Sequence, residues 1–129
     1  MESSRYKRGL EKFRAVDGKS GKKAVDDLKE IIPEIERYIV EYPFGDIYSR
    51  PGLDLKIREL AAISALTAMG NAEPQLKVHI HSALNNGATR QEVVEVILQM
   101  SVYAGFPVAI NALYTARGIF RGRDQKGKS

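Results

Sequence analysis

The chain contains no cysteine among its 129 residues. Thiol redox chemistry is therefore excluded, because the thiolate is the reacting group. No run of 18 or more apolar residues is present, so the sequence offers no membrane-spanning helix and no membrane partner is expected. The opening segment MESSRYKRGLEKF lacks the apolar centre of an export signal. We therefore expect a cytoplasmic protein.

Several sequence motifs of enzyme sites are also missing. The chain has no glycine-rich phosphate loop, no nucleophile elbow and no cluster with metal-ligand spacing, so no metal site is predicted. No segment alternates apolar and polar residues with period two, as a half-buried strand would. The sequence therefore predicts an all-α protein.

Apolar residues recur at helical spacing through most of the chain. We expect six or so helices, over about 4–15, 22–32, 55–69, 74–85, 92–103 and 107–120, with a short one after Pro33. Thr89 and Glu92 have the spacing of a capping box. The segment 42–54 is rich in proline and glycine and predicts a loop. Together these features predict one domain over 1–122 and a disordered basic tail over 123–129.

Two of the expected helices, 55–69 and 92–103, are apolar on nearly all sides. A domain of this size has few places to bury both helices. They form either a tight centre of the chain or part of a surface that is buried between subunits. We therefore expect a homo-oligomer.

The net charge is +4, and the excess is concentrated near both ends of the chain. Basic ends can bind nucleic acid through phosphates, but no recognised nucleic-acid motif accompanies them. Solvated terminal arms explain the charge better, so nucleic acid is disfavoured as a partner. A basic rim would also attract a small anionic molecule.

Two histidines stand two residues apart in the expected helix 74–85. His79 lies at the edge of the apolar stripe, whereas His81 lies on the polar side near Lys77. Because residues at i and i+2 of a helix do not converge, a metal site that uses both is disfavoured. His79 is predicted to face inward, and His81 outward as a candidate substrate contact.

Glu59 precedes the most apolar part of the chain, where a charge is costly unless it is paired or used. It could simply be a carboxylate favoured by the positive end of its helix. It could also pair with His79 in an apolar pocket and form a proton relay. An inward histidine alone is more often structural than catalytic.

Other polar residues could contact a substrate. Arg50 and Arg58 flank the loop and the following helix, and either could bind a carboxylate bidentately or form a structural ion pair. Tyr103 shares a face with Val96 and Met100, so its ring is expected in the core, with its hydroxyl in need of a partner. Asn111 is a lesser candidate.

Three segments, GDIYSRPGLDLKIREL, LKVHIHSALNNGATRQEVVEVILQ and VYAGFPVAINAL, resemble the γ-carboxymuconolactone decarboxylase family. The likeness extends from about Arg5 to Phe120. It implies a fold similar to that of the alkylhydroperoxidases, which use a glutamate, two cysteines and a histidine. Glu59 and His79 match the glutamate and the histidine, whereas the cysteine positions fall near Ala72 and Gln75. Thiol-dependent peroxide reduction is therefore excluded.

The resemblance implies decarboxylation of 4-carboxymuconolactone to 3-oxoadipate enol-lactone, a step in aromatic catabolism, without a cofactor. It further implies His79 as the proton-transfer group supported by Glu59, a carboxylate held by Arg50 or Arg58, and a lactone contact from Tyr103. The family commonly assembles as a hexamer, a trimer of dimers.

Two positions depart from the decarboxylase pattern, where a small polar residue often stands in place of Glu59 and an arginine in place of His81. Another proton-transfer reaction on a small carboxylate or lactone, such as isomerisation or lactone hydrolysis, is therefore an alternative. A non-enzymatic oligomeric binding protein on the same fold is a second alternative.

Overall fold

The structure, a computed structural model, describes residues 3–127, without the side chains of Lys19 and Ser20. The described chain is all-α, as predicted. It divides into two compact units near Leu55, and the single domain expected over 1–122 stays a prediction. No described helix is both long enough and apolar enough to cross a membrane.

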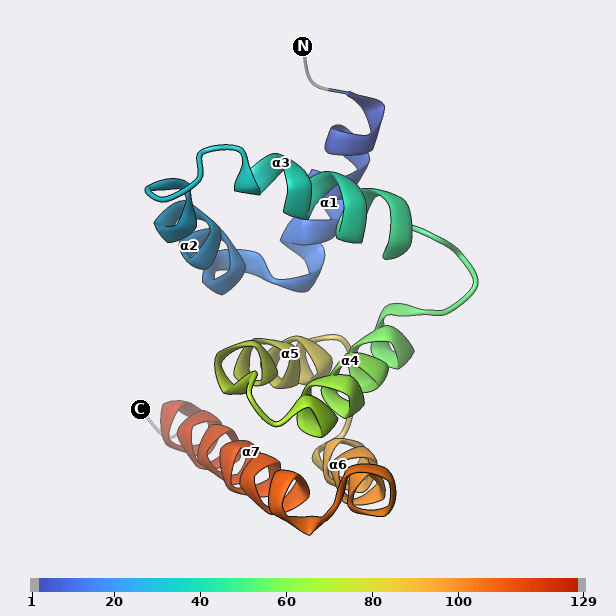
Figure 1. The fold of residues 1–129 in the computed structure, drawn as a ribbon, viewed down its shortest axis with the longest axis vertical. Coiled ribbons are helices and arrows are strands. Elements are labelled where there is room, and N and C mark those ends of the chain that lie inside the picture. The colour runs from blue at the N-terminus through green and yellow to red at the C-terminus, as the bar shows by residue number, and fades with distance from the viewer. Residues whose placement is uncertain (1–2, 128–129) are drawn as a thin grey trace. The chain divides into compact units, whose positions relative to one another are not determined.

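The first unit contains α1 (Ser4–Val16), α2 (Gly18–Lys29), α3 (Ile35–Ile39) and the π-helix η1 (Val40–Ile47), which continues α3 (Figure 1). Its core is made of apolar side chains from three of these elements: Phe13, Val16, Val25, Val40 and Phe44. Within this unit α1 crosses the α3–η1 segment closely.

The loop predicted over 42–54 is wrong for its first half, since η1 runs to Ile47. Pro43 has no N–H to donate to an ordinary helix turn, and the backbone instead forms the wider π pattern, in which the N–H of Tyr48 donates to the carbonyl of Pro43 at 2.7 Å. Burial of Phe44 against α1 favours this arrangement. Tertiary packing thus outweighs the local turn signal.

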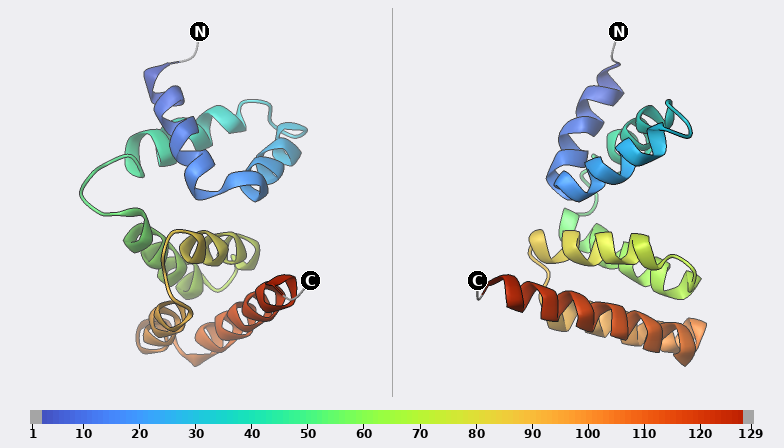
Figure 2. Two further views of the ribbon diagram at one scale, coloured as in Figure 1. Left: turned by 180° about the vertical axis from the view of Figure 1, so that it is seen from behind. Right: turned by 90° about the vertical axis from the view of Figure 1, so that its left-hand side faces the viewer.

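The second unit holds α4 (Leu55–Met69), α5 (Glu73–Asn85), α6 (Arg90–Ala104) and α7 (Phe106–Gly127). Figure 2 shows α5 and α6 each alongside α7. Ile63, Ile80 and Ile97 meet in the centre, each fully buried. The bounds of α4 and the capping box of α6 agree with the sequence prediction.

The expected disordered tail, 123–129, is helical through Gly127 because α7 extends well beyond Phe120. Residues 128–129 of that tail lie outside the described residues. Arg123 explains part of the extension, since its guanidinium donates to His81 and Asn85 of α5. Residues 123–127 are therefore helical because of the contacts they make, although their basic composition predicted disorder.

The two apolar helices are less buried in the single chain than the sequence suggested. Only Glu59, Ile63 and Thr67 of α4 are buried, so this helix does not occupy the middle of the unit. The prediction that Tyr103 is core is wrong, because the residue is 75% exposed. It belongs instead to a set of exposed apolar residues on α6 and α7: Leu98, Val102, Tyr103, Phe106, Ile110 and Tyr114.

Candidate active site

The centre of the candidate site is a contact between Glu59 of α4 and His79 of α5. The Nδ1 atom of His79 lies 2.6 Å from Oε2 of Glu59. The side chain of Glu59 is fully buried, whereas that of His79 is 21% exposed. The structure thus brings together the two residues that the sequence selected for catalysis.

The local sequence explains why these side chains meet. Glu59, Ile63 and Thr67 recur every four residues and form the single buried face of α4. On α5, Leu76, Ile80 and Ala83 form the buried stripe, and His79 lies at its edge. Packing these two faces together places the carboxyl group against the imidazole.

The carboxyl group of Glu59 uses only one of its oxygens. Its Oε1 atom is buried and has no hydrogen-bond partner among the described residues. Burying such an oxygen without a partner costs free energy of folding. The Glu59 bond to Nδ1 fixes the orientation of the imidazole ring and leaves Nε2 as the ring atom that faces away from the carboxyl group.

The structure separates the two histidines. His81 is exposed, and its Nδ1 accepts a hydrogen bond from Arg123 at 3.0 Å. A guanidinium only donates, so this ring nitrogen carries no proton. Partial burial of the ring lowers the pKa of His81, and the positive charges of Arg123 and Lys126 lower it further. Sequence reasoning missed Arg123, which it placed in the tail.

The two arginines predicted to bind a carboxylate belong to different units of the chain. Arg58 is half-buried on α4, directly before Glu59, whereas Arg50 is exposed and belongs to the first unit. Their roles, and the substrate contact proposed for Tyr103, stay predictions. Among residues 3–127, no group of three or more histidine, aspartate or glutamate side chains could hold a metal ion.

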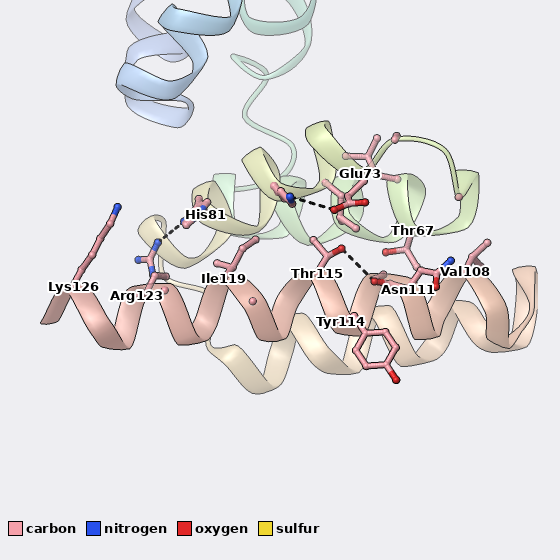
Figure 3. Close-up of a pocket in the computed structure, with 18 residues that line it drawn as sticks. Thr67, Glu73, His81, Val108, Asn111, Tyr114, Thr115, Ile119, Arg123 and Lys126 are labelled. Atoms are coloured by element: carbon pink, nitrogen blue, oxygen red, sulfur yellow. Dashed lines mark hydrogen bonds and ion pairs between the residues drawn. The ribbon is translucent and has the colours of Figure 1, made fainter. Parts of the chain in front are cut away.

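The second unit also contains a cavity of about 740 Å³, lined by residues of α4, α5 and α7 (Figure 3). His81, Arg123 and Asn111 line it, but Glu59 and His79 do not. The sequence carried one signal for it, a series of polar and small residues along one face of the last helix: Asn111, Thr115, Gly118 and Gly122.

Comparison with known proteins shows the family of this chain. The model of the carboxymuconolactone decarboxylase family matches residues 33–117. The chain is 35% identical over 121 residues to a 4-carboxymuconolactone decarboxylase of Acinetobacter baylyi, covering 93% of this chain and 90% of that protein. It is 38% identical over 100 residues to an uncharacterized 15.0 kDa protein of Paracoccus denitrificans, covering 77% and 75%.

A third relative is a nitrosuccinic acid decarboxylase of Metarhizium robertsii, 32% identical over 93 residues, which covers 72% of this chain and 64% of that protein. The family match includes both Glu59 and His79, and two of the three relatives carry the name of a decarboxylase. The chain belongs to the carboxymuconolactone decarboxylase family.

Proposed function

We propose that this protein is a carboxy-lyase that decarboxylates 4-carboxymuconolactone to 3-oxoadipate enol-lactone and CO2, with His79 as the proton-transfer group. Family membership and the names of the relatives support the reaction class. The observation that carries the residue assignment is the 2.6 Å contact between His79 and the buried Glu59.

The substrate itself supplies the electron sink for this reaction. The carboxylate leaves a ring carbon that is conjugated through a ring double bond to the lactone carbonyl. When the bond to CO2 breaks, its electron pair moves through that double bond onto the carbonyl oxygen. The resulting oxyfuran-like anion then takes a proton on carbon, which gives the enol-lactone. No cofactor is needed to hold the electron pair.

The residues of this chain have four tasks in that reaction. His79 delivers the proton to carbon through Nε2, because Nδ1 is engaged with Glu59. Glu59 is a positioning residue that holds the ring and stabilises its protonated form. Arg58 and Arg50 are the candidates for holding the carboxylate that remains on the product, and Tyr103 for bonding the lactone.

A different small carboxylate is the second candidate substrate. One relative is named for nitrosuccinic acid rather than for a lactone, so the names of the relatives already span two substrates. Glu59 and His79 would keep the same roles, because a proton must replace CO2 on carbon in either reaction.

We further propose that the protein is a homo-oligomer, with the hexamer that the family resemblance implies as its form. Six exposed apolar residues on α6 and α7 support this proposal, among them Val102 at 76% and Tyr103 at 75% exposure. Exposed apolar surface of this extent is typical of a surface that contacts another protein chain. Small carboxylates and lactones, rather than nucleic acid, are the proposed ligands.

The test is turnover of 4-carboxymuconolactone followed by ultraviolet absorbance, with the wild-type protein and two variants of His79. His79→Ala removes the imidazole, and His79→Gln keeps an N–H that can bond to Glu59 but transfers no proton. Both should lower kcat by about 10²-fold or more, as loss of a general acid does. His81→Gln removes the other imidazole and should leave kcat unchanged, with any substrate contact visible as a raised KM.

Far-UV circular dichroism of each variant is the control for correct folding. Undiminished kcat in His79→Gln would refute the assigned role. A folded wild-type protein that leaves 4-carboxymuconolactone unchanged but decarboxylates another small carboxylate would favour the second candidate. Inactivity with both classes would favour a binding protein.

A further inference from the structure

The cavity between α5 and α7 has the size of a small-molecule site. Its volume of about 740 Å³ falls within the range of roughly 300–1,000 Å³ that is usual for ligand pockets. Apolar side chains form much of its lining: Leu66, Leu76, Val108, Ala112 and Ile119. Such a lining suits a ligand with an apolar body.

One end of the cavity carries positive charge. Arg123 and Lys126 lie there, on the last two turns of α7 (Figure 3). The guanidinium of Arg123 donates to Nδ1 of His81 at 3.0 Å and to Oδ1 of Asn85 at 2.9 Å. Both acceptors are neutral, and no carboxylate pairs with Arg123 in the described part of the chain. The charge of Arg123 is therefore held in place without being neutralised.

The other end offers uncharged polar groups. Thr67 and Asn111 lie there (Figure 3). The hydroxyl of Thr67 is buried, with the residue only 2% exposed, and it has no hydrogen-bond partner within residues 3–127. A ligand in the cavity therefore meets the exposed side chain of Asn111 rather than this buried hydroxyl.

The negative charge in the lining is already compensated. Glu73 forms an ion pair with Lys77 at 3.2 Å, one turn along α5. Of the remaining charged residues of the lining, Arg123 is a cation whose described partners are both neutral. The cavity as a whole therefore favours an anion.

Two glycines of α7 keep the cavity open. A Cβ atom added at Gly118 or Gly122 would meet no heavy atom within 4 Å, and both residues line the cavity. Glycine inside a helix costs about 0.5–1 kcal/mol relative to alanine. The open space is thus retained at positions where a side chain would fit the fold.

We propose that the cavity between α5 and α7 binds a small organic anion with an apolar body, at a site separate from the Glu59–His79 pair. The anionic group lies against Arg123, the body covers the apolar lining, and a polar group at the far end meets Asn111. Neither residue of the pair lines the cavity, so this site is independent of the proposed catalytic step.

The test uses 2-naphthoate as the probe, because the chain has no tryptophan and the fluorescence of the probe can be followed without interference. The full-length wild-type protein should bind it saturably. 2-Naphthamide, which has nearly the same shape but no charge, should bind about tenfold more weakly or worse, as should 2-naphthoate with Arg123→Gln, since each change removes a charge-assisted contact.

Three further variants locate the probe. Gly118→Leu fills the cavity with a side chain that the fold can accept, and should abolish binding. Gly127→Leu makes the same change on the same helix outside the lining and should keep the wild-type affinity. His79→Gln should also keep it, because the pair lies elsewhere.

Unchanged binding in Gly118→Leu, or loss of binding in His79→Gln, would place the probe at another site and overturn the proposal. Equal affinity for 2-naphthamide would overturn its anionic part. An absence of saturable binding, together with an altered oligomer mass in Gly118→Leu, would show instead that a second copy of the chain covers the cavity.

Discussion

Replacing the two members of the Glu59–His79 pair should have unequal effects on stability. Glu59→Met removes a fully buried carboxyl group and substitutes an unbranched apolar side chain of similar length. The lost bond to His79 is worth about 1.5–3 kcal/mol. The oxygen Oε1, which is buried without a partner in the described chain, costs about 1–3 kcal/mol. These terms nearly cancel.

The exposure of the imidazole that remains in Glu59→Met further limits the loss of stability. His79 is 21% exposed, so water can take the place of the carboxyl group at Nδ1. We therefore expect Glu59→Met to unfold with a free energy within about 1 kcal/mol of the wild-type value. His79→Leu is the opposite case, because it leaves both oxygens of a fully buried carboxyl group without a partner. It should cost about 3–5 kcal/mol.

The assay is urea denaturation followed by circular dichroism at one protein concentration, because an oligomer's apparent stability depends on concentration. The double variant Glu59→Met with His79→Leu completes a cycle and should recover most of the stability that His79→Leu loses. Equal destabilisation by the two single variants would refute the reasoning, since it would mean that the pair stabilises the fold rather than serving the reaction.

Three other predictions follow from the described contacts. Gly9→Ala should destabilise the first unit by about 1–3 kcal/mol or more in denaturation experiments, because the new Cβ would collide with backbone atoms of η1. Gly118→Ala is the matched control and should be neutral or stabilising, because its Cβ meets open space. Val102→Glu, at 76% exposure, should lower the mass measured by light scattering, and an unchanged mass would exclude this face from the interface. The pKa of His81 is lower in the folded chain than in the unfolded chain, where it is near 6.5. The free energy of unfolding should therefore fall as the pH drops from above 6.5 towards the pKa of the folded state. His81→Gln should flatten this part of the curve of stability against pH.

Local signals in the sequence were enough to predict most helices of the second unit. The bounds of α4 and the Thr89–Glu92 capping box depend on residues that are adjacent in the chain. Glu59 and His79 were each predicted from burial on their own helix, and their contact follows because both buried faces share one core.

Features that depend on distant partners were not predicted. The π-helix η1 forms because Phe44 packs against α1, and the end of α7 is helical while Arg123 contacts α5. The helical pattern around Tyr103 predicted that its ring is buried, but in the single chain the residue is exposed. In each case the deciding neighbour lies far away in the sequence, or is expected on another copy of the chain.

The buried face of α4 carries Glu59 and Thr67, each with a side-chain oxygen that lacks a partner among residues 3–127, and Ile63 lies between them. Thr67 follows Glu59 by eight positions of the helix, which corresponds to about 12 Å along the axis. Ile63 is fully buried and has no side-chain atom that can donate or accept a proton. Ile63 therefore cannot pass a proton between Glu59 and Thr67 along this face of α4. In the proposed mechanism the exposed edge of the His79 ring is therefore the route by which its proton exchanges with solvent, and filling the cavity, which His79 does not line, should leave this exchange unchanged.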